Sequence, residues 1–420
     1  MLIFLACAAN GVDETYPALI FTGAVATLLL ACTIRPEFRR ELARIRLPWS
    51  LIAAFGATLL VALWSLSPWV PGGPQPVWSF TDASGAGALD RSRVIVEVIK
   101  LLGLACVFVV GLVYGAAERQ GRRLGLAILI GGAVFALWSL SVFAAAAQTG
   151  GARLNSGLPS ANIAGTLWAV LLLLAFSLPS MASRRRPSRN QLERVTARYA
   201  PTIALALLFG ACLLLTASRG AMIAAALGGV VYLGFRALTA QLKRWELISA
   251  GLLAALISLG MFLTKGDIAL ARFQRFQVDA TGRKLMIAAH FKAFLLSPIM
   301  GYGLRSFDAV NKFFMTAQTY PELRNVRATH NVYVQWLEEA GLLGALPMFL
   351  TVVLIMVPCL KSVLSGRRSS PWLSALLVAD IVFLIHGLSD FTLEVPAMAA
   401  LWTLLLGLQY GLVTSGRRVA

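Results

Sequence analysis

The sequence THNVYVQWLEEAGLLGALPMFL, residues 329–350, ends like a membrane-spanning helix but begins with polar groups. At 100° per residue, Asn331, Gln335 and Glu338 fall within about 60° of one another, on one face of a helix. His330 stands at the mouth of that face. Polar groups at membrane depth cost free energy unless they face a cavity or one another. The face therefore marks either a functional site or a set of structural hydrogen bonds inside a helical bundle.

The composition is that of an integral membrane protein. Of 420 residues, 58% are hydrophobic and 13% are charged, and the mean hydropathy is +0.76. A spanning helix needs about 20 apolar residues. About eleven apolar runs approach that length, at residues 17–33, 48–67, 94–117, 124–147, 158–180, 199–216, 220–238, 245–264, 332–360, 371–390 and 394–413. The apolar start, residues 1–9, predicts one short helix more, which gives an all-α, polytopic bundle of about twelve transmembrane helices.

Lysine and arginine residues predict the orientation of this bundle. They cluster in every second connection, around residues 35–46, 119–123, 184–198, 236–244, 361–368 and 417–418. By the positive-inside rule, these connections and both termini lie on the cytoplasmic side. Only one outer connection is long. It divides the chain into a transmembrane bundle at 1–263, a periplasmic loop domain with helices at 264–329, and C-terminal transmembrane helices at 330–420.

The long outer loop carries an excess of positive charge on the side where it is not expected. Ten Lys and Arg residues stand against four Asp and Glu residues. Long loops translocate regardless of charge, so this excess does not change the predicted topology. The basic residues face either anionic lipid or an anionic substrate. We favour a substrate because the polar face beginning at His330 lies beside the loop, and we include Arg283 and Arg305 among its ligands.

Several classes of site lack support in the sequence. The five cysteines all fall in predicted spans, so neither a disulfide framework nor a metal cluster is indicated. The histidines, at 290, 330 and 386, are too scattered for a zinc site. The chain has no Asp-x-Asp pair and no Gly-rich phosphate loop. Its net charge of +18 is spread over both sides of the membrane, which argues against nucleic acid. We expect no metal and no cofactor.

A charged stripe lies at the outer end of the span that begins near residue 94. Arg93, Glu97 and Lys100 are spaced i, i+4 and i+7, so they share one helix face. Lys100 lies about 10 Å below the start of the helix at 1.5 Å per residue. The stripe is equally consistent with an internally neutralised ion pair and with a phosphate ligand at Lys100.

Two other polar groups are predicted at the same outer face. Arg219, in the sequence TASRGA, occupies a turn too short to leave the membrane surface, where it is either an interfacial anchor or part of a site. In HGLSDFTLE, His386 and Asp390 are one helical turn apart. Asp390 lies at the outer end and is suited to orient a nearby imidazole.

The run THNVYVQWLEEAGLLG resembles the His-Asn, Glu, Gly-Leu-Leu-Gly signature of the O-antigen ligase and polymerase superfamily. In that family the signature follows a large periplasmic loop. The segment GRKLMIAAHFKAFLLSPIMGYGLRSF, residues 282–307, resembles the preceding family block, with Arg283 at its start and a Pro-x-x-Gly-x-Gly turn at Gly301 and Gly303. The chain departs from the family at Ile287, where many relatives have Trp.

Two earlier segments complete the resemblance. TASRGA is similar to the family's Ser-Arg-Gly turn and places Arg219 in it. RLNSGLPSANIAG is similar to an Arg, Gly, Pro-x-Asn pattern through Arg153, Gly157 and Asn162. The order and sidedness of these motifs, rather than any single one, carry the resemblance.

The resemblance implies a GT-C-like glycosyltransferase of the bacterial inner membrane. Its donor is O-antigen linked to undecaprenyl pyrophosphate and its acceptor is the lipid A-core, joined at the periplasmic face. Neutral His330 is expected to take the proton of the acceptor hydroxyl, with Asp390 holding the imidazole or sharing the proton. Arg219, Arg283 and Lys100 are expected to stabilise the leaving pyrophosphate without a metal. The expected substrate-binding residues are Lys100, Arg153, Asn162, Asn331, Glu338 and Arg305.

Two other functions stay open at this point. A polymerase would use the same site but extend another lipid-linked glycan. A lipid-linked glycan transporter would use polar faces to line a path without chemistry. The transporter is less favoured because the polar groups gather near the outer face rather than the midplane, and no internal repeat is evident.

The predicted topology is testable by cysteine labelling in intact spheroplasts. A membrane-impermeant thiol reagent should label a cysteine introduced between residues 264 and 329, and should not label Arg40→Cys, Arg185→Cys or Arg367→Cys until the membrane is opened. The reason is that basic residues cluster in every second connection along the chain. Labelling of Arg185→Cys from outside would contradict the orientation.

Overall fold

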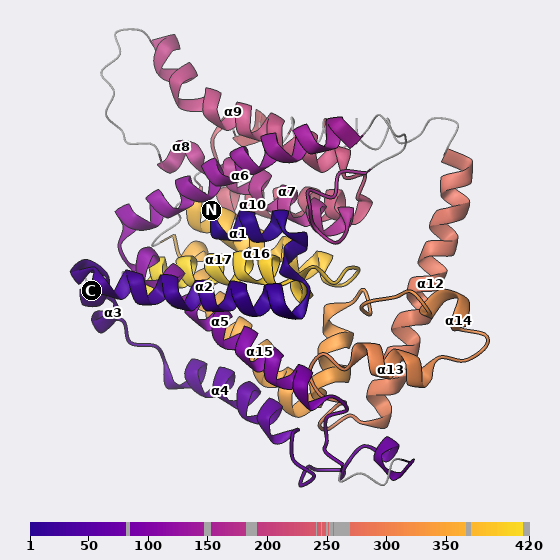
Figure 1. The fold of residues 1–420 in the computed structure, drawn as a ribbon. Helices are drawn as coiled ribbons and strands as arrows, with labels where there is room; N and C mark the ends of the chain where they lie inside the picture. Colours follow the sequence, from indigo (N-terminus) through magenta and orange to yellow (C-terminus); the bar gives the residue numbers. More distant parts are fainter. Residues whose placement is uncertain are drawn as a thin grey trace.

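The computed structural model describes residues 1–80, 85–146, 153–181, 191–240, 242–244, 246–248, 251, 255, 269–366 and 371–414. Over these residues the chain is helical, without β-strands, and most helices lie together in one bundle (Figure 1). The prediction of an all-α fold is therefore confirmed. The long apolar helices begin and end within a few residues of the predicted spans.

Six helices of the described part are long and apolar enough to cross a membrane. They are α2 (Thr15–Ile34), α5 (Arg91–Ala116), α6 (Glu118–Ala146), α10 (Arg219–Leu238), α15 (Val332–Leu364) and α17 (Pro396–Thr414). A seventh is the pair α3 (Pro36–Arg44) and α4 (Trp49–Trp64), bent by 100°. Shorter apolar helices are α7 (Ala161–Ala175), the part Tyr199–Leu215 of α9 (Gln191–Leu215), and α16 (Pro371–His386).

The expected total of twelve spans is not reached among the described residues. Most of the predicted span at 245–264 lies outside them. The apolar start forms α1 (Leu2–Ala8), whose seven residues are too few to cross a bilayer alone. The remaining short helices are η1 (Asn10–Val12), η2 (Pro76–Phe80), α8 (Leu178–Met181), α13 (Phe307–Phe314), α14 (Tyr320–Leu323) and η4 (Thr392–Glu394).

Side-chain caps fix the starts of the helices that reach the candidate site. Ser160 caps α7, Ser218 caps α10 and Asn331 caps α15, each accepting hydrogen bonds from backbone amides of the first turn. Such caps satisfy donors that have no partner within the helix. The residues that follow each cap in sequence are therefore held in a defined direction.

Glycines bring α5 and α17 into backbone contact. Gly111 and Gly115 face Gly407 and Gly411, two Gly-x-x-x-Gly pairs on opposite helices. A Cβ on Gly115 would lie 2.2 Å from the Leu408 carbonyl oxygen. Small residues at this spacing let two helix backbones approach closely, which is the main source of attraction between helices in lipid.

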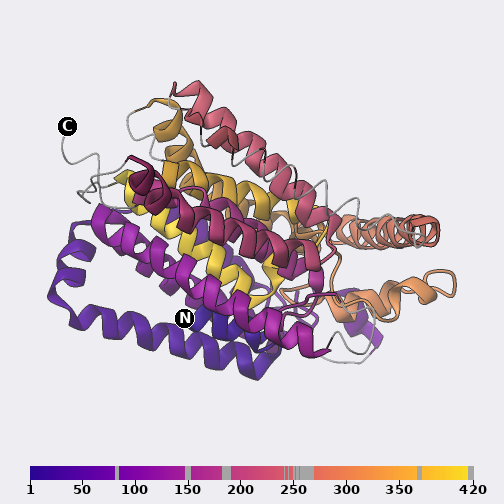
Figure 2. The same ribbon diagram turned by 90° about the horizontal axis from the view of Figure 1, so that it is seen from above.

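The centre of the bundle contains α7, α16 and α17. Every residue of α7 except Asn162 is buried, and α17 is buried from Pro396 to Val413 apart from Thr403. The helices α2, α4 and α6 expose large apolar side chains such as Ile20, Leu60 and Leu137. This division suits a bundle whose outer helices face lipid, and both ribbon views show α4 at the margin of the bundle (Figures 1 and 2).

Between residues 269 and 323, the chain forms α12 (Ala269–Leu296), α13 and α14 at one end of the bundle. Figures 1 and 2 both show these helices at the end opposite to the arginine-rich helix α3. The predicted outer loop and a predicted inner connection are therefore at opposite ends.

The glycine contact predicts a large cost for a single methyl group. Gly411→Ala should lower the thermal stability of the purified protein, because its Cβ would lie 2.2 Å from the Leu112 carbonyl oxygen. Overpacking of this kind costs about 1–3 kcal/mol. The matched control is Gly56→Ala in α4, where no atom lies within 4 Å of the added Cβ. Equal melting temperatures for the two variants would show that the α5–α17 contact is loose.

Candidate functional site

The two motifs that flank the end of the loop meet in the structure. α15 breaks at Gly341, whose φ of 58° lies in the left-handed region, and the turn after α12 lies against this break. The Tyr302 amide donates to the Glu338 carbonyl at 3.0 Å. A Cβ on Gly301 would lie 2.4 Å from that same carbonyl oxygen. Both glycines are needed because the two backbones touch here.

Groups of the protein itself occupy the polar face of α15. The Asn331 side-chain oxygen accepts from the amides of Tyr333 and Val334 at 3.1 Å. The Gln335 amide group donates to Glu339 at 3.1 Å. This matches the structural alternative for the face. The substrate-binding roles of Asn331 and Glu338 stay predictions.

Glu338 pairs with a histidine of the loop. Nδ1 of His290 lies 2.5 Å from Oε2 of Glu338, and the two side chains are 2% and 0% exposed. The His290 ring also stacks on Phe307, with ring centroids 4.5 Å apart. His290 follows Arg283 by two helical turns on α12, so both lie on the same face. The pair therefore holds the Arg283 face of α12 against α15.

His330 lies directly before α15 with a φ of 50°. Its ring packs edge-on against Phe391, with ring centroids 4.9 Å apart. Its Nδ1 is buried and has no hydrogen-bond partner among the described residues. Burial lowers the pKa of His330 to about 4, and the Arg283 guanidinium lowers it too. The imidazole is therefore neutral at pH 7, as a general base must be.

Asp390 lies in the connection between α16 and α17 and is fully buried. Its Oδ1 accepts from the Phe391 amide at 2.8 Å and from the Thr392 hydroxyl at 3.4 Å. Burial raises the pKa of Asp390 to about 6, although the Asn162 side chain and the Arg283 guanidinium lower it. No hydrogen bond joins Asp390 to His330 within the described residues. The neighbouring Phe391 contacts the His330 ring instead.

Arg153 ties two helix starts together. Its Nε donates to the Thr216 carbonyl at 2.7 Å, in the turn before α10, and a terminal nitrogen donates to the Asn162 oxygen at 2.9 Å, at the start of α7. Arg219 is the first residue of α10, after this turn. Arg153 and Asn162, which the sequence places in one motif, are therefore in direct contact.

Arg283 connects these groups electrostatically. Its positively charged guanidinium interacts electrostatically with His330, with His386 and with Asp390. The structure thus gathers a neutral imidazole, a buried carboxyl group and a guanidinium near the starts of α7, α10 and α15. A neutral base can remove the proton of a hydroxyl. Fixed cations beside it can stabilise the charge on an anionic leaving group.

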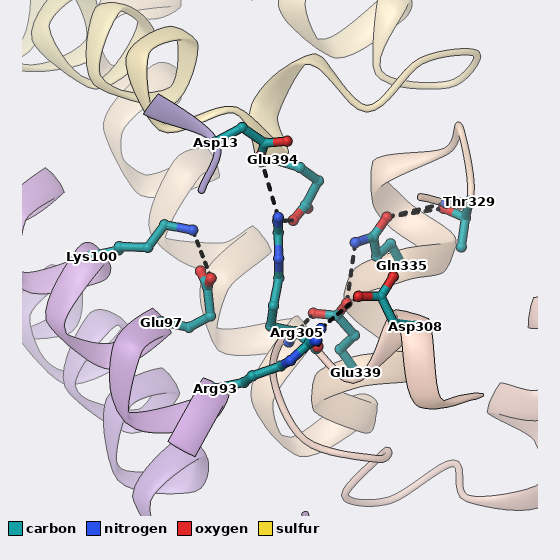
Figure 3. Close-up of polar contacts among 10 residues, drawn as sticks. All are labelled: Asp13, Arg93, Glu97, Lys100, Arg305, Asp308, Thr329, Gln335, Glu339 and Glu394. Carbon is teal, nitrogen blue, oxygen red and sulfur yellow. Dashed lines mark hydrogen bonds and ion pairs between the residues drawn. The ribbon is translucent and has the colours of Figure 1, made fainter. Parts of the chain in front are cut away.

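Lys100 and Arg305 lie in a second cluster that is rich in carboxylates (Figure 3). Lys100 pairs with Glu97 at 2.6 Å. Arg305 contacts Asp13 at 3.2 Å and Glu394 at 3.8 Å, as Figure 3 shows. The ion pair, one of the two alternatives for Lys100, is therefore present.

Two more contacts complete this cluster. The Arg305 amide donates to Glu339 at 2.6 Å, and Arg93 pairs with Asp308 at 2.7 Å rather than with Glu97. Burial raises the pKa of Glu394 to about 7, although Arg305 lowers it. The cluster joins the N-terminal segment, α5, the loop and the connection before α17.

A pocket lies beside this cluster, between α2, α5 and α17. Its empty volume is about 570 Å³, part of which is open solvent, and its polar lining includes Glu97, Lys100 and Glu394. The rest of the lining is mostly apolar, with Phe21 and Leu104 among its members. Among the residues that the structure describes, no three His, Cys, Asp or Glu side chains are grouped so as to hold a metal ion.

Sequence reasoning missed several residues around the site. Asp13 and Glu394 have a visible signal, because each is an acid at the end of an apolar run. Phe391, Thr166 and Thr392 have none, since a single aromatic or hydroxyl residue in a membrane helix or turn is common. Their positions emerge only from the packing of α7 against α16 and η4.

Comparison with known proteins gives one match. Residues 204–350 match the family model of O-Antigen ligase, a range that includes Arg219, Arg283, His330 and the glycines of both motifs. No curated protein matches the chain. The resemblance seen in the sequence is confirmed over this range, so residues 204–350 are similar to the O-antigen ligase family.

Proposed function

We propose that this protein is an O-antigen ligase of the bacterial inner membrane. It transfers glycan from undecaprenyl pyrophosphate to a sugar of the lipid A-core at the periplasmic face, in lipopolysaccharide biosynthesis. The observation that carries the proposal is the gathering of His330, Asp390 and Arg283 at one end of the bundle, the end of the loop helices. Of the cations beside them, Arg219 begins α10, and Arg153 lies before α7 and donates to the Thr216 carbonyl in the turn before α10.

In this proposal His330 removes the proton from the acceptor hydroxyl as that oxygen attacks the anomeric carbon. A neutral imidazole is required, and burial keeps His330 neutral. Its low pKa makes it a weak base in the empty site. A bound pyrophosphate would offset the positive charge of Arg283, which is the second cause of the lowered pKa, and would raise the basicity of the imidazole when the donor is present.

The leaving pyrophosphate gains negative charge as the glycosidic bond breaks. Arg283 and Arg219 are the proposed partners for that charge, since guanidinium groups bind phosphate oxygens in pairs. Arg153 and Asn162 form the proposed contact surface for the substrate next to them. A fixed set of cations stabilises the leaving group without a metal ion, so we propose that transfer is metal-independent.

The nature of the product tests this function. Purified protein in detergent, supplied with undecaprenyl-pyrophosphate-linked glycan and lipid A-core, should produce lipid A-core that carries the glycan, identified by mass. Turnover should persist in excess chelator. A doubled lipid-linked glycan would identify a polymerase, and a product that depends on added magnesium would contradict the role proposed for the arginines.

His330→Ala should reduce glycan transfer by about 10² to 10⁴, the usual cost of losing a general base. Donor affinity should change little, because the cations that bind pyrophosphate are intact. Arg283→Ala should weaken donor binding as well, so the two roles are separable. Transfer rates at several donor concentrations measure both quantities.

The control variant is His290→Ala. It breaks the buried pair with Glu338 and should lower the melting temperature, since an unpaired buried charge is costly. Near-normal transfer by His330→Ala, together with loss of transfer in a folded His290→Ala protein, would move the base into the loop and contradict the mechanism.

A further inference from the structure

A chain of buried side chains links Asp390 to His386. The Thr392 hydroxyl donates to Asp390 at 3.4 Å. Oγ1 of Thr392 lies 3.2 Å from Oγ1 of Thr166, and Oγ1 of Thr166 lies 2.6 Å from Nδ1 of His386. We propose that Thr166 and Thr392 are positioning residues that join Asp390 and His386 into one hydrogen-bond chain, through which the ring tautomer of His386 follows the protonation of Asp390.

Burial closes the chain to water. Asp390, Thr392 and Thr166 are 0% exposed and His386 is 3% exposed. The other acceptor near Thr166 is the Asn162 carbonyl at 3.5 Å, which is farther than His386 and Thr392. Each of the two hydroxyls has one proton to donate and few acceptors within reach. The direction in which one hydroxyl donates therefore determines the direction of the other.

The chain has two consistent directions. When Asp390 is ionised, Thr392 donates to it, Thr166 donates to Thr392, and His386 donates from Nδ1 to Thr166. When Asp390 carries the proton, it donates to Thr392, and every bond reverses until Nδ1 of His386 accepts from Thr166. Each hydroxyl gives one proton and takes one, so the change from ionised to protonated Asp390 takes up one proton in total: Nδ1 of His386 releases its proton into the chain, and Nε2 takes up a proton from outside the chain. An ionised Asp390 thus leaves the lone pair of a neutral His386 on Nε2.

Nε2 of His386 points toward the start of α10. A Cβ on Gly220 would lie 2.9 Å from this nitrogen and 3.6 Å from the Ser389 hydroxyl. Glycine at position 220 therefore leaves room for the ring next to Arg219. This places the far end of the chain at the turn to which we assign the leaving pyrophosphate, so the inference rests on the proposed function for its use.

The charged and titratable groups around the chain come from every neighbouring element. Arg283 from α12 acts on Asp390 and His386. Asn162, held by Arg153, faces Asp390 from α7. Arg219 precedes Gly220 on α10, Glu394 follows on η4, and His330 lies beyond Phe391 at the start of α15. Of these groups, the positively charged Arg283 favours the ionised form of Asp390. It thereby favours the direction of the chain in which Nδ1 of His386 is a donor.

The test uses nuclear magnetic resonance of the full-length protein with ¹⁵N-labelled histidine in lipid nanodiscs. The three rings are assigned with His290→Asn, His330→Asn and His386→Asn variants. Above pH 6, His386 should show a protonated Nδ1, and its ring signals should change with the midpoint of Asp390, whose pKa is about 6. Thr392→Val should abolish that response, and Thr392→Ser should retain it. Thr166→Val and Thr166→Ser form a second matched pair.

Transfer assays show whether the reaction uses the chain. Thr392→Val should lower kcat and move the acidic limb of its pH profile upward, because Asp390 loses a donor to its charged form. Thr392→Ser should behave like the wild type. Melting curves within a few degrees of the wild type establish that each variant is folded, and His290 signals serve as an internal control.

The outcomes separate this inference from the proposed function. An identical His386 response in the wild type, Thr392→Val and Asp390→Asn would overturn the chain, whatever the protein transfers. A coupled response with an unchanged kcat and pH profile in the valine variants would overturn the positioning role. Absence of any glycan transfer by the wild type would contradict the proposed function, while the resonance data would still decide whether the chain exists.

Discussion

The structure depends on the contact between the backbones of α5 and α17. Helices in lipid gain little from burying apolar side chains, because the lipid is equally apolar, so close packing must supply the attraction. Gly111 and Gly115 against Gly407 and Gly411 allow that packing. The contact fixes the start of α17, and with it the connection that carries Asp390 and Glu394. Asp390 and Glu394, one in each polar cluster, therefore precede a helix that close glycine packing holds in place.

A second glycine contact positions the loop against α15. Gly301 and Gly341 let the turn after α12 hydrogen-bond to the broken backbone of α15. The pair of His290 and Glu338 adds a side-chain contact beside it. Together they hold Arg283, which is carried by the loop, near His330, which precedes a membrane helix. A loop held only at its two ends keeps many conformations. The distance between Arg283 and His330 would then be undetermined.

The sequence predicted the helices better than the partnerships between them. Apolar length located α2, α5 and α17 within a few residues, because a membrane span has a strong compositional signal. Helical periodicity placed Glu338 on a polar face, but the partner on that face, His290, is 48 positions away. Periodicity defines a face without naming the neighbour. For the same reason, the sequence predicts that Asp390 orients a nearby imidazole but does not predict the hydroxyl groups that lead from Asp390 to His386.

The two polar clusters differ in their distribution of charge. Around Lys100 and Arg305 stand the carboxylates of Asp13, Glu97, Glu339 and Glu394. Acids outnumber bases there, and burial raises the pKa of Glu394 to about 7, so part of this negative charge is neutralised near pH 7. The guanidinium of Arg283 acts on a neutral histidine and on a single aspartate instead. Under the proposed function, this difference favours the surroundings of Arg283 for an anionic pyrophosphate, while substrate binding at Lys100 and Arg305 stays a prediction.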